Sequence, residues 1–435
     1  MYLSRHLKIK ELRNGSYAVF NNLLLNVLYA DKFEVQKIKN FKVRKDEQAV
    51  LRRIGVYVDD YTTDDNAELE LRNSYEKRKR AFKVMYLLVT NNCNLRCRYC
   101  FLENNPNYGT ERFSMKKETA RIATKKFCEH VKKEGVKDAL IFLYGGEPLI
   151  NLEAIKACVD EIHNSNADVK LSMVSNGTLL DEEIAHFLKD NNIDVGVSID
   201  GTKELHDRNR PFRFGNIGSY EKANMGINNL NSIGGKCGLS ITISKEFLKH
   251  QDEVLTWIKN KNINGIFYNM LHYCNYDPEW EYHSKKTAEY IIKSYEKFKN
   301  SKIEDGRLNR QITSIKNRQF LFSDCAAVGC AQFVVMPDGH ITICHGDSNT
   351  DKHIVGNIDN IDITDIFNTD EAKAWSKRST VYNDFCLNCE AIYCCGGGCK
   401  QQAEVITGSR DNIDKTYCIY VKEVLQYFIE ACYDR

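Results

Sequence analysis

The chain has 435 residues, of which 43% are hydrophobic and 28% are charged, and its formal net charge is +2. This length and apolar content suffice for two or three domains with buried cores. The balanced charge does not favour a nucleic-acid partner, and no apolar run approaches the ~20 residues needed to span a membrane. Because residues 1–6 begin no signal-peptide pattern, we expect a cytoplasmic protein without a membrane partner.

Cysteine is abundant, with 17 in the chain, three of them between residues 93 and 100 and eight between residues 325 and 399. In a reducing compartment such clusters favour metal binding over disulfide bonds. Four others lie in predicted helices or strands and are expected to be inert thiols: Cys128, Cys158, Cys237 and Cys432. Cys274 follows the last predicted strand of the central part and is a candidate for a functional role.

Residues 1–81 are predicted to form a small α+β domain. Alternating apolar residues favour short strands at about 7–10, 16–20 and 23–28, with Asn21 and Asn22 as a turn. Helical periodicity follows at about 46–54 and 65–79.

From residue 82 to about 315, apolar strands alternate with amphipathic helices. The predicted strands are 84–90, 139–144, 170–175, 194–199, 238–243 and 265–270, and the helices between them are 116–133, 152–164, 181–190, 220–233 and 252–261. Repeated βα units imply a parallel sheet with right-handed crossovers, and six units suggest an open (β/α)6 barrel in the α/β class. Functional side chains are then expected at the carboxyl ends of the strands.

A loop with three cysteines follows the first of these strands. Cys93, Cys97 and Cys100 have the spacing C-x3-C-x2-C. Three thiolates give a [4Fe–4S] cluster three ligands and leave one iron open, whereas electron-transfer cubanes normally take four cysteines. Soft thiolates also suit zinc, although a structural zinc site normally has four ligands.

This loop, with Tyr99 beside its last cysteine, resembles the signature of the radical S-adenosylmethionine (SAM) superfamily. The resemblance implies that the three cysteines hold a [4Fe–4S] cluster and that SAM chelates the open iron. One electron from the cluster would then split SAM into methionine and a 5′-deoxyadenosyl radical.

The next predicted strand ends in Gly145-Gly146-Glu147-Pro148. The two glycines allow close approach of the backbone to a ligand, and Glu147 can accept a hydrogen bond from an ammonium group. The sequence is similar to the family's GGEP motif, which implies that Glu147 holds the amino group of SAM. Taken alone, the same residues are also typical of a simple strand-to-helix turn.

Two later strands end in further polar motifs. Ser175 and Asn176 follow the third strand, and Ser198 and Asp200 follow the fourth. The family resemblance implies that the first pair lies near the ribose and methionine part of SAM and the second near its carboxylate and ribose. Asn176-Gly177 is also an ordinary turn pair.

The charged stretch from His206 to Arg210 matches an H-D-x-x-R segment found in the peptide-modifying branch of the family. Such a run is usually a solvated loop. The resemblance implies instead that Arg210 pairs with a carboxylate such as that of SAM.

After about residue 320 the helical periodicity is expected to stop. Pro337-Asp338-Gly339 predicts a hairpin turn between two apolar strands. The cysteine spacing of residues 316–435 resembles a SPASM domain, which binds two auxiliary [4Fe–4S] clusters. The resemblance implies one cluster on Cys325, Cys330, Cys344 and Cys399, and another on Cys386, Cys389, Cys395 and Cys418. Paired zinc ribbons are the alternative, and Cys394 leaves the register beside Cys395 open.

Two branches of the family fit these features. One comprises maturases that form thioether or related crosslinks in a ribosomally made precursor peptide, and the other comprises anaerobic sulfatase-maturating enzymes, which make formylglycine. Residues 1–81 resemble small domains that capture a leader peptide as an added strand, although a structural cap is the alternative. Sulfatase maturases carry an acidic residue after the cysteine equivalent to Cys344, where this chain has His345, with Asp347 two residues on; both are candidate bases.

The resemblance further implies three clusters, SAM and an electron donor such as flavodoxin or ferredoxin. A non-catalytic electron-transfer or metal-binding protein and a tRNA-modifying enzyme are other possibilities. The GGEP sequence argues against the first, and the absence of a basic stripe argues against the second.

Overall fold

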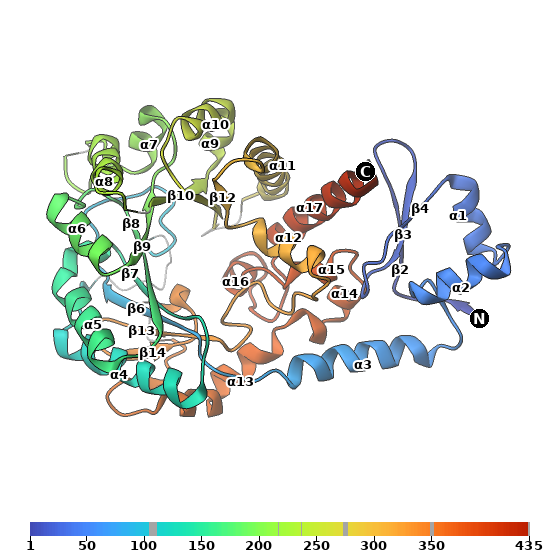
Figure 1. Cartoon of the computed structure of the whole chain (residues 1–435), viewed down its shortest axis with the longest axis horizontal. Helices are drawn as coiled ribbons and strands as arrows, with labels where there is room; N and C mark the ends of the chain where they lie inside the picture. Colours follow the sequence, from blue (N-terminus) through green and yellow to red (C-terminus); the bar gives the residue numbers. More distant parts are fainter. Residues whose placement is uncertain (104–110, 216, 236, 273–276, 349–351, 434–435) are drawn as a thin grey trace.

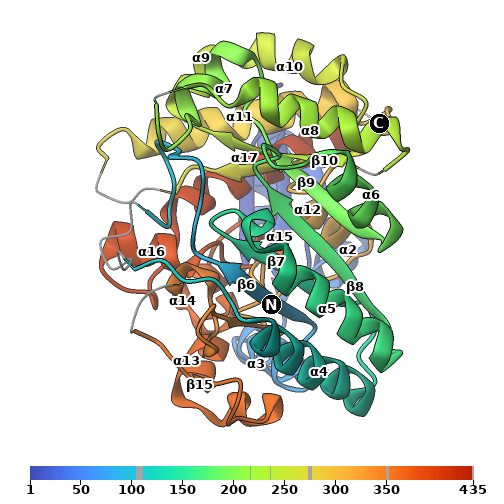
Figure 2. The same ribbon diagram turned by 90° about the vertical axis from the view of Figure 1, so that its left-hand side faces the viewer.

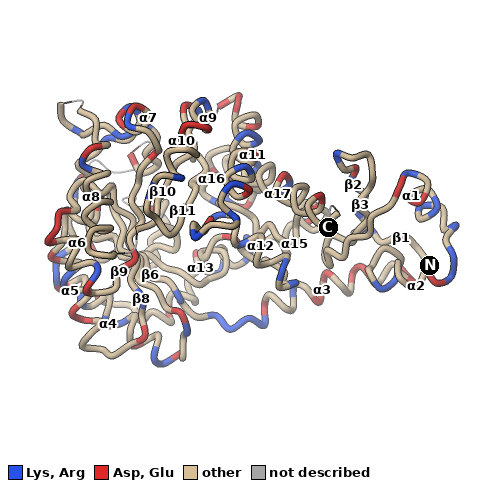
Figure 3. Tube along the Cα trace, turned by 45° about the horizontal axis from the view of Figure 1, so that its top comes forward, with Lys and Arg blue, Asp and Glu red and all other residues tan. Residues whose placement is uncertain are grey.

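The structure, a computed structural model, describes residues 1–103, 111–215, 217–235, 237–272, 277–348 and 352–433. A cysteine-rich C-terminal part lies between an N-terminal unit and a central sheet that is covered by helices (Figure 1). Residues of both charges are interspersed over all three parts (Figure 3). None of the described helices combines the length and apolar character of a membrane span.

Six parallel strands of the central sheet follow one another in space in chain order. They are β6 (Val84–Thr90), β7 (Ala139–Gly145), β8 (Val169–Ser175), β9 (Ile193–Ser198), β10 (Cys237–Ile243) and β11 (Gly265–Met270). The helices α4 (Lys117–Glu134), α5 (Leu152–Ser165), α6 (Glu182–Asp190), α8 (Tyr220–Ser232) and α10 (Gln251–Lys259) connect them. Figures 1 and 2 show these helices along the outer side of the curved sheet.

The alternation of side chains along each strand separates two faces of the sheet. In β7, Ala139, Ile141 and Leu143 are buried in the main core, whereas Phe142 and Tyr144 are partly exposed on the other face. Because successive side chains point to opposite faces, the helix-covered face forms the core. The concave face is left more open, and the carboxyl ends of the strands meet at one rim.

The α/β barrel class predicted from the sequence is confirmed. Every predicted strand of the barrel agrees with the structure to within one residue at each end. The sheet is nevertheless longer than six strands. β12 (Glu304–Asp305) pairs with β11, and β13 (Gln332–Val335) pairs in parallel with β6. β13 continues into the predicted hairpin with β14 (His340–Thr342), which also pairs with β15 (Gly356–Asn357).

The N-terminal unit contains a three-stranded antiparallel sheet of β2 (Leu7–Glu11), β3 (Tyr17–Asn21) and β4 (Leu28–Ala30), and a short pair of β1 (Tyr2–Leu3) with β5 (Tyr57–Val58). Its helices are α1 (Lys32–Lys39), α2 (Lys45–Arg53) and α3 (Thr62–Glu76). The predicted strand at 23–28 is wrong, because the amides of Leu24 and Leu25 fold back onto the Asn21 carbonyl and form a turn. Helix α1 was not predicted, although Asp31 and Glu34 form a capping box at its start.

The prediction that helical structure stops after residue 320 is also wrong. Beyond α11 (Trp280–Phe298) and α12 (Asn309–Lys316), the C-terminal part contains α13 (Asp370–Lys377), α14 (Asp384–Leu387), α15 (Ile392–Cys395), α16 (Lys400–Thr407) and α17 (Lys415–Tyr433). Most of these are too short to show a clear period. Helix α17 is long, and it packs along α11 through buried residues at three- and four-residue spacing, including Tyr417, Tyr420 and Val424.

Candidate active site

The cysteine loop extends from the carboxyl end of β6, where Cys93, Cys97 and Cys100 are partly exposed. Burial raises the pKa of Cys93 to about 12 and that of Cys97 to about 11. Thiols in this setting resist ionisation until a metal replaces the proton. Three thiols on one loop at the rim therefore fit a cluster held by three cysteines.

A second segment runs antiparallel to this loop and holds its backbone. The amide of Arg96 donates to the Pro211 carbonyl at 2.9 Å, and the amide of Arg98 donates to the Asn209 carbonyl at 2.9 Å. Leu95 and Phe212 form a bridge between the two. The stretch that looked like a solvated loop thus supports the cysteine loop.

Arg213 continues this support with its side chain. Its Nε donates to the Cys93 carbonyl at 2.9 Å and its Nη2 to the Leu95 carbonyl at 3.1 Å. The guanidinium also pairs with Glu103. This role of Arg213 was not predicted from the sequence. The available signal was an additional arginine three residues after Arg210.

The two glycines at the end of β7 are required by the backbone of the neighbouring strand. A Cβ atom on Gly145 would lie 2.1 Å from the Thr90 carbonyl oxygen, and one on Gly146 would lie 2.3 Å from the Asn92 oxygen. The amide of Gly146 donates to Thr90 at 2.9 Å. The close approach expected for a ligand is therefore made, in this structure, to the start of the cysteine loop.

Glu147 lies at the centre of a buried hydrogen-bond network. Its Oε1 accepts hydrogen bonds from the Ser175 hydroxyl at 2.8 Å and the Leu149 amide at 3.1 Å, and its Oε2 accepts one from the Asn176 amide at 2.6 Å. Burial raises the pKa of Glu147 to about 7, although these donors act in the opposite direction. A cation bound nearby would stabilise the carboxylate. Pro148 begins the short helix that follows.

Asn176 joins the end of β8 to the cysteine loop. Its Nδ2 donates to Asn94 Oδ1 at 2.8 Å and lies 4.0 Å from Cys93 Sγ. Asn94 Nδ2 donates in turn to Thr178 Oγ1 at 2.8 Å. The motif after β8 and the motif after β6 therefore form one polar cluster.

Asp200, Tyr99 and Arg210 form a second polar cluster, beyond the end of β9. Tyr99 Oη donates to Asp200, and Arg210 Nη2 donates to Asp200 Oδ1 at 3.1 Å. The Arg210 guanidinium lies 5.3 Å from the centre of the Tyr99 ring. Burial alone would raise the pKa of Asp200, but Arg210 and the other donors hold that pKa below its usual value. Ser198, the last residue of β9, is buried and pairs with Ser240 of β10.

Arg210 keeps one donor without a partner. Its Nε is buried and has no acceptor among the residues that the structure describes. A buried guanidinium donor without an acceptor is costly, and an anionic group bound at the rim would satisfy it.

His345 sits in an aromatic pocket that is formed by residues of the barrel and of the cysteine loop. Its ring stacks on Tyr86 at 5.0 Å between centres and meets the edges of Tyr144 and Phe101. Burial lowers the pKa of His345 to about 4, with His272 adding to the effect. An imidazole with this pKa is neutral near pH 7.

Asp347, the other candidate base, is buried and paired. Arg410 donates to both of its carboxylate oxygens, through Nη1 at 2.9 Å to Oδ2 and through Nη2 to Oδ1. A bidentate pair of this kind fixes the carboxylate. The geometry favours a structural role for Asp347 over proton transfer.

In the second predicted set, Cys395 lies near enough to the other three cysteines to interact with them electrostatically. Burial raises the pKa of Cys395 well above its usual value, and Cys418, Cys389 and Cys386 each add to the rise. The neighbouring Cys394 instead donates through its Sγ to the Ala391 carbonyl at 3.7 Å. This arrangement supports the predicted register.

The first set is gathered less completely. Burial raises the pKa of Cys344 well above its usual value, and Cys325 and Cys399 contribute. The Sγ of Cys330 instead points to the Ala372 carbonyl at 3.6 Å, and its backbone is left-handed, with φ of 48°. Among the described residues, no three His, Cys, Asp or Glu side chains are close enough to hold a single metal ion.

The remaining cysteines lie apart from these groups. Cys128, Cys158 and Cys237 are buried, and Cys432 is exposed. Cys274 falls outside the described residues.

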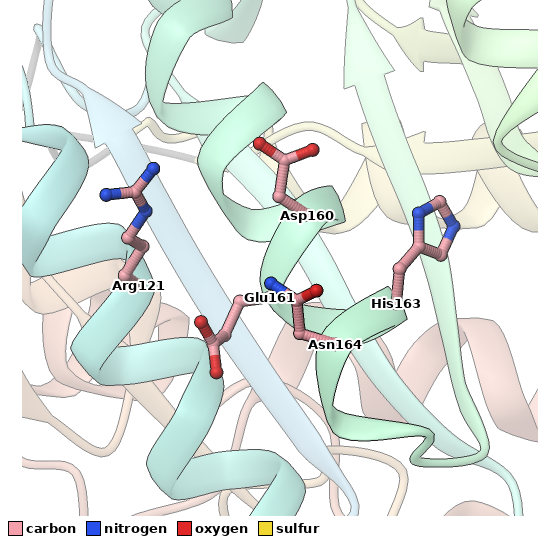
Figure 4. Close-up of a pocket in the computed structure, with 5 residues that line it drawn as sticks. All are labelled: Arg121, Asp160, Glu161, His163 and Asn164. Atoms are coloured by element: carbon pink, nitrogen blue, oxygen red, sulfur yellow. The ribbon is translucent and has the colours of Figure 1, made fainter.

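A shallow depression on the outer surface does not belong to this site (Figure 4). It lies between α4 and α5 and is lined by Arg121, Asp160, Glu161, His163 and Asn164. All of these residues lie on the two helices and none on a loop at the rim.

Comparison with known families places two domains on the chain. Residues 87–258 match the radical SAM superfamily, and residues 325–390 match SPASM, an iron–sulfur cluster-binding domain. These domains imply iron–sulfur clusters and SAM as cofactors.

Two relatives of different function are similar to most of this chain. A cysteine-type anaerobic sulfatase-maturating enzyme of Clostridium perfringens is 28% identical, over 78% of this chain and 94% of its own length. The radical SAM cyclopropyl synthase TigE of Paramaledivibacter caminithermalis is 24% identical, over 99% of this chain and 92% of its own length.

The solved structures of SuiB from Streptococcus suis share the fold. One has S-adenosylmethionine bound, and another, bound to the precursor peptide SuiA, superposes with a TM-score of 0.57 at 14% identity. The second match covers 96% of this chain and 99% of SuiB. The chain therefore contains a radical SAM domain followed by a SPASM domain.

Proposed function

We propose that this radical SAM enzyme installs a thioether or related crosslink in a ribosomally synthesised precursor peptide. The observation that carries this proposal is the N-terminal unit. TigE matches 99% of the chain and SuiB 96%, so both matches include that unit, whereas the sulfatase-maturating enzyme matches 78%. SuiB, which shares the unit, binds the precursor peptide SuiA in one of its solved structures.

Different residues at the rim would bind different parts of the cofactor. Cys93, Cys97 and Cys100 would hold the first cluster, and the network of Glu147 would meet the amino group of SAM. The unpartnered Nε of Arg210 supports a contact with the carboxylate of SAM. When bound, SAM supplies the radical that removes a hydrogen atom from the substrate.

The remaining SAM contacts are proposed from the same polar clusters. Tyr99, Asp200 and Ser198 would line the ribose side, with Ser175 and Asn176 beside the methionine part. Gly145, Gly146 and Pro148 would set the path of the backbone between them.

The two groups of C-terminal cysteines would each hold a further [4Fe–4S] cluster, making three in all. One would use Cys386, Cys389, Cys395 and Cys418, and the other Cys325, Cys330, Cys344 and Cys399. Forming a thioether removes one hydrogen atom and one proton from the peptide and leaves one electron, which an auxiliary cluster would accept. A flavodoxin or ferredoxin would supply the first cluster with electrons.

We propose three functional units, residues 1–81, 82–315 and 316–435. The first would bind the leader of the peptide by adding a strand to its three-stranded sheet.

Sulfatase maturation is the second candidate function. It is favoured by the 28% identity to the Clostridium perfringens enzyme over nearly all of that protein's length. His345 weakens it, because it stands where these enzymes carry an acidic residue.

The test is mass spectrometry of candidate substrates after anaerobic incubation with reconstituted enzyme, SAM and a reductant. The substrates are a short cysteine-containing peptide encoded beside the gene and a sulfatase-derived peptide. We expect the first to lose two hydrogen atoms per site and to have fewer alkylatable cysteines. Loss of hydrogen with all cysteines alkylatable would indicate a carbon–carbon or carbon–oxygen bond instead.

Formylglycine in the sulfatase peptide, with the neighbouring peptide unchanged, would establish the second candidate. As a control, Cys93→Ala should abolish formation of 5′-deoxyadenosine. A normal rate in that variant would show that the cysteine loop is not the cofactor site.

A further inference from the structure

The N-terminal unit contacts the second group of auxiliary cysteines directly. Asn22, which follows β3, is buried, and its Nδ2 donates to the carbonyls of Leu387 at 2.8 Å and Cys389 at 2.7 Å. Both carbonyls belong to the turn that carries Cys386 and Cys389. One amide from the N-terminal unit thus fixes the backbone of two cysteines that lie more than 350 residues further along the chain.

Apolar side chains of the same unit also pack against this turn. Leu23 packs in a small buried cluster with Cys386, Leu387 and Ile392, and Ala67 and Leu71 of α3 pack against it. The cluster is separate from the main barrel core. Figure 1 shows the N-terminal sheet on the side of α14 that faces away from the barrel, with α3 running below both.

Lys8 of β2 is partly buried and lies two residues before Lys10, so both side chains point to the face of the strand that contacts the turn of Cys386 and Cys389. The pKa of Lys8, in β2, is lowered mainly by burial, while the thiolate of Cys389 and the Glu390 carboxylate act in the opposite direction. Burial raises the pKa of Cys389, whereas Lys422 and Lys8 act in the opposite direction. The next lysine on this face, Lys10, is neutralised by Glu390 at 2.8 Å.

We propose that the N-terminal unit is a working part of the second auxiliary centre: Asn22 positions the turn of Cys386 and Cys389, and the charge of Lys8 makes the cluster bound there easier to reduce. Both are positioning residues. The proposal rests on the proposed function in one respect, the presence of a cluster on these four cysteines.

The physical reason is electrostatic. Four thiolates leave a cubane negatively charged, and reduction adds another negative charge. A half-buried ammonium group is screened less than one in water, so it stabilises the reduced state more than the oxidised state. The N-terminal unit then affects electron transfer as well as any binding of the peptide.

The test measures the reduction potential of this cluster by electron paramagnetic resonance during a redox titration. The background is the full chain with Cys93, Cys97 and Cys100 changed to Ala, so that only auxiliary clusters contribute. The signal of the second centre is the one that Cys395→Ala removes. In this background we expect Lys8→Met to shift the midpoint potential to a more negative value.

Two matched variants separate charge from packing. Lys8→Arg retains the charge and should keep the midpoint near that of the parent. Lys39→Met removes an exposed lysine from α1, on the far side of the sheet, and should change nothing. An unchanged potential in Lys8→Met would overturn the role of the charge.

Asn22→Asp tests the turn, because it replaces the two donors with acceptors facing two carbonyls. We expect this cluster to release iron to a chelator faster, with the other auxiliary cluster unaffected. If this cluster in Asn22→Asp released iron at the same rate as in the parent, the role of Asn22 would be overturned. If the parent shows no signal that depends on Cys395, the cluster assignment itself fails, and the proposal fails with it.

Discussion

Arg210 and Asp200 form a buried ion pair, with Nη2 3.1 Å from Oδ1, at the rim where the cysteine loop meets the end of β9. Tyr99 is held by both residues, through a hydrogen bond to Asp200 and a stack under the guanidinium. Through Tyr99, the pair therefore links the end of the cysteine loop, at Cys100, to the barrel. It also orients an arginine whose Nε still lacks an acceptor among the described residues.

Arg210→Lys should weaken SAM binding while the fold is retained. Lysine keeps a positive charge near Asp200 but lacks the planar guanidinium group, which can donate to two acceptors at once. A hydrogen bond to a charged group contributes about 1.5–3 kcal/mol, so we expect the Kd for SAM to rise about tenfold or more. Equilibrium binding to the reconstituted enzyme measures this.

The matched control is Arg208→Lys. Arg208 lies two residues away, is exposed, and pairs with Glu246 on the surface. Its Kd for SAM should equal that of the wild type. An unchanged Kd in Arg210→Lys would remove the arginine from the cofactor site.

Gly146→Ala should destabilise the protein through the backbone. The new Cβ would lie 2.3 Å from the Asn92 carbonyl oxygen, so the β7 turn and the cysteine loop must move apart. Overpacking of this kind costs about 1–3 kcal/mol and should lower the thermal midpoint. It should also reduce iron retained at the first cluster.

Gly238→Ala in β10 provides the comparison. Its Cβ would meet its nearest atom at 3.5 Å, an ordinary contact distance. The thermal midpoint should then change little. If the two alanine variants had the same thermal midpoint, the close approach at Gly146 would not be what requires glycine there.

The barrel and the motifs at its rim could be predicted because they are local. Each strand is a short segment rich in apolar residues, and Glu147 and Asn176 follow within two residues of the ends of their strands. The carboxyl ends of parallel strands must meet at one rim, so the order of motifs predicts their neighbourhood. The ion pair of Arg210 with Asp200 was not predicted, although both residues were assigned to the site.

The supports of the site could not be predicted, because their partners are distant in the chain. Arg213 binds a loop that is 120 residues earlier, and Asn22 binds one that is 367 residues later. No periodicity encodes such contacts. Asp347 was predicted as a candidate base from its local sequence. In the structure it is paired with Arg410, 63 residues away.

Cys395→Ala should remove the second auxiliary cluster, whereas Cys394→Ala should not. Cys395 lies with Cys386, Cys389 and Cys418, while Cys394 bonds to the Ala391 carbonyl. Iron content and the electron paramagnetic resonance spectrum of the reduced protein measure the difference. The reverse pattern would shift the register of the site by one residue.

His206 should make stability depend on pH. It is fully buried in α7 (Lys203–Asn209), where Nδ1 accepts a hydrogen bond from the Asp200 amide and Nε2 bonds the Ser219 hydroxyl at 2.9 Å. Burial lowers the pKa of His206 to about 4, from 6.5, despite the opposing charge of Asp200. The unfolded chain therefore binds a proton more readily than the folded chain between these values.

It follows that the contribution of His206 to stability is complete above pH 6.5 and is lost as pH falls toward 4, by roughly 3 kcal/mol in all. His206→Gln removes this titration, so its thermal midpoint should fall less than that of the wild type between pH 7 and about pH 5. His250→Gln, at a partly exposed histidine just after α9 (Lys245–Lys249), should follow the wild type. Parallel pH profiles for all three proteins would show that the ring is protonated in the folded state and that the Asp200 amide has another acceptor.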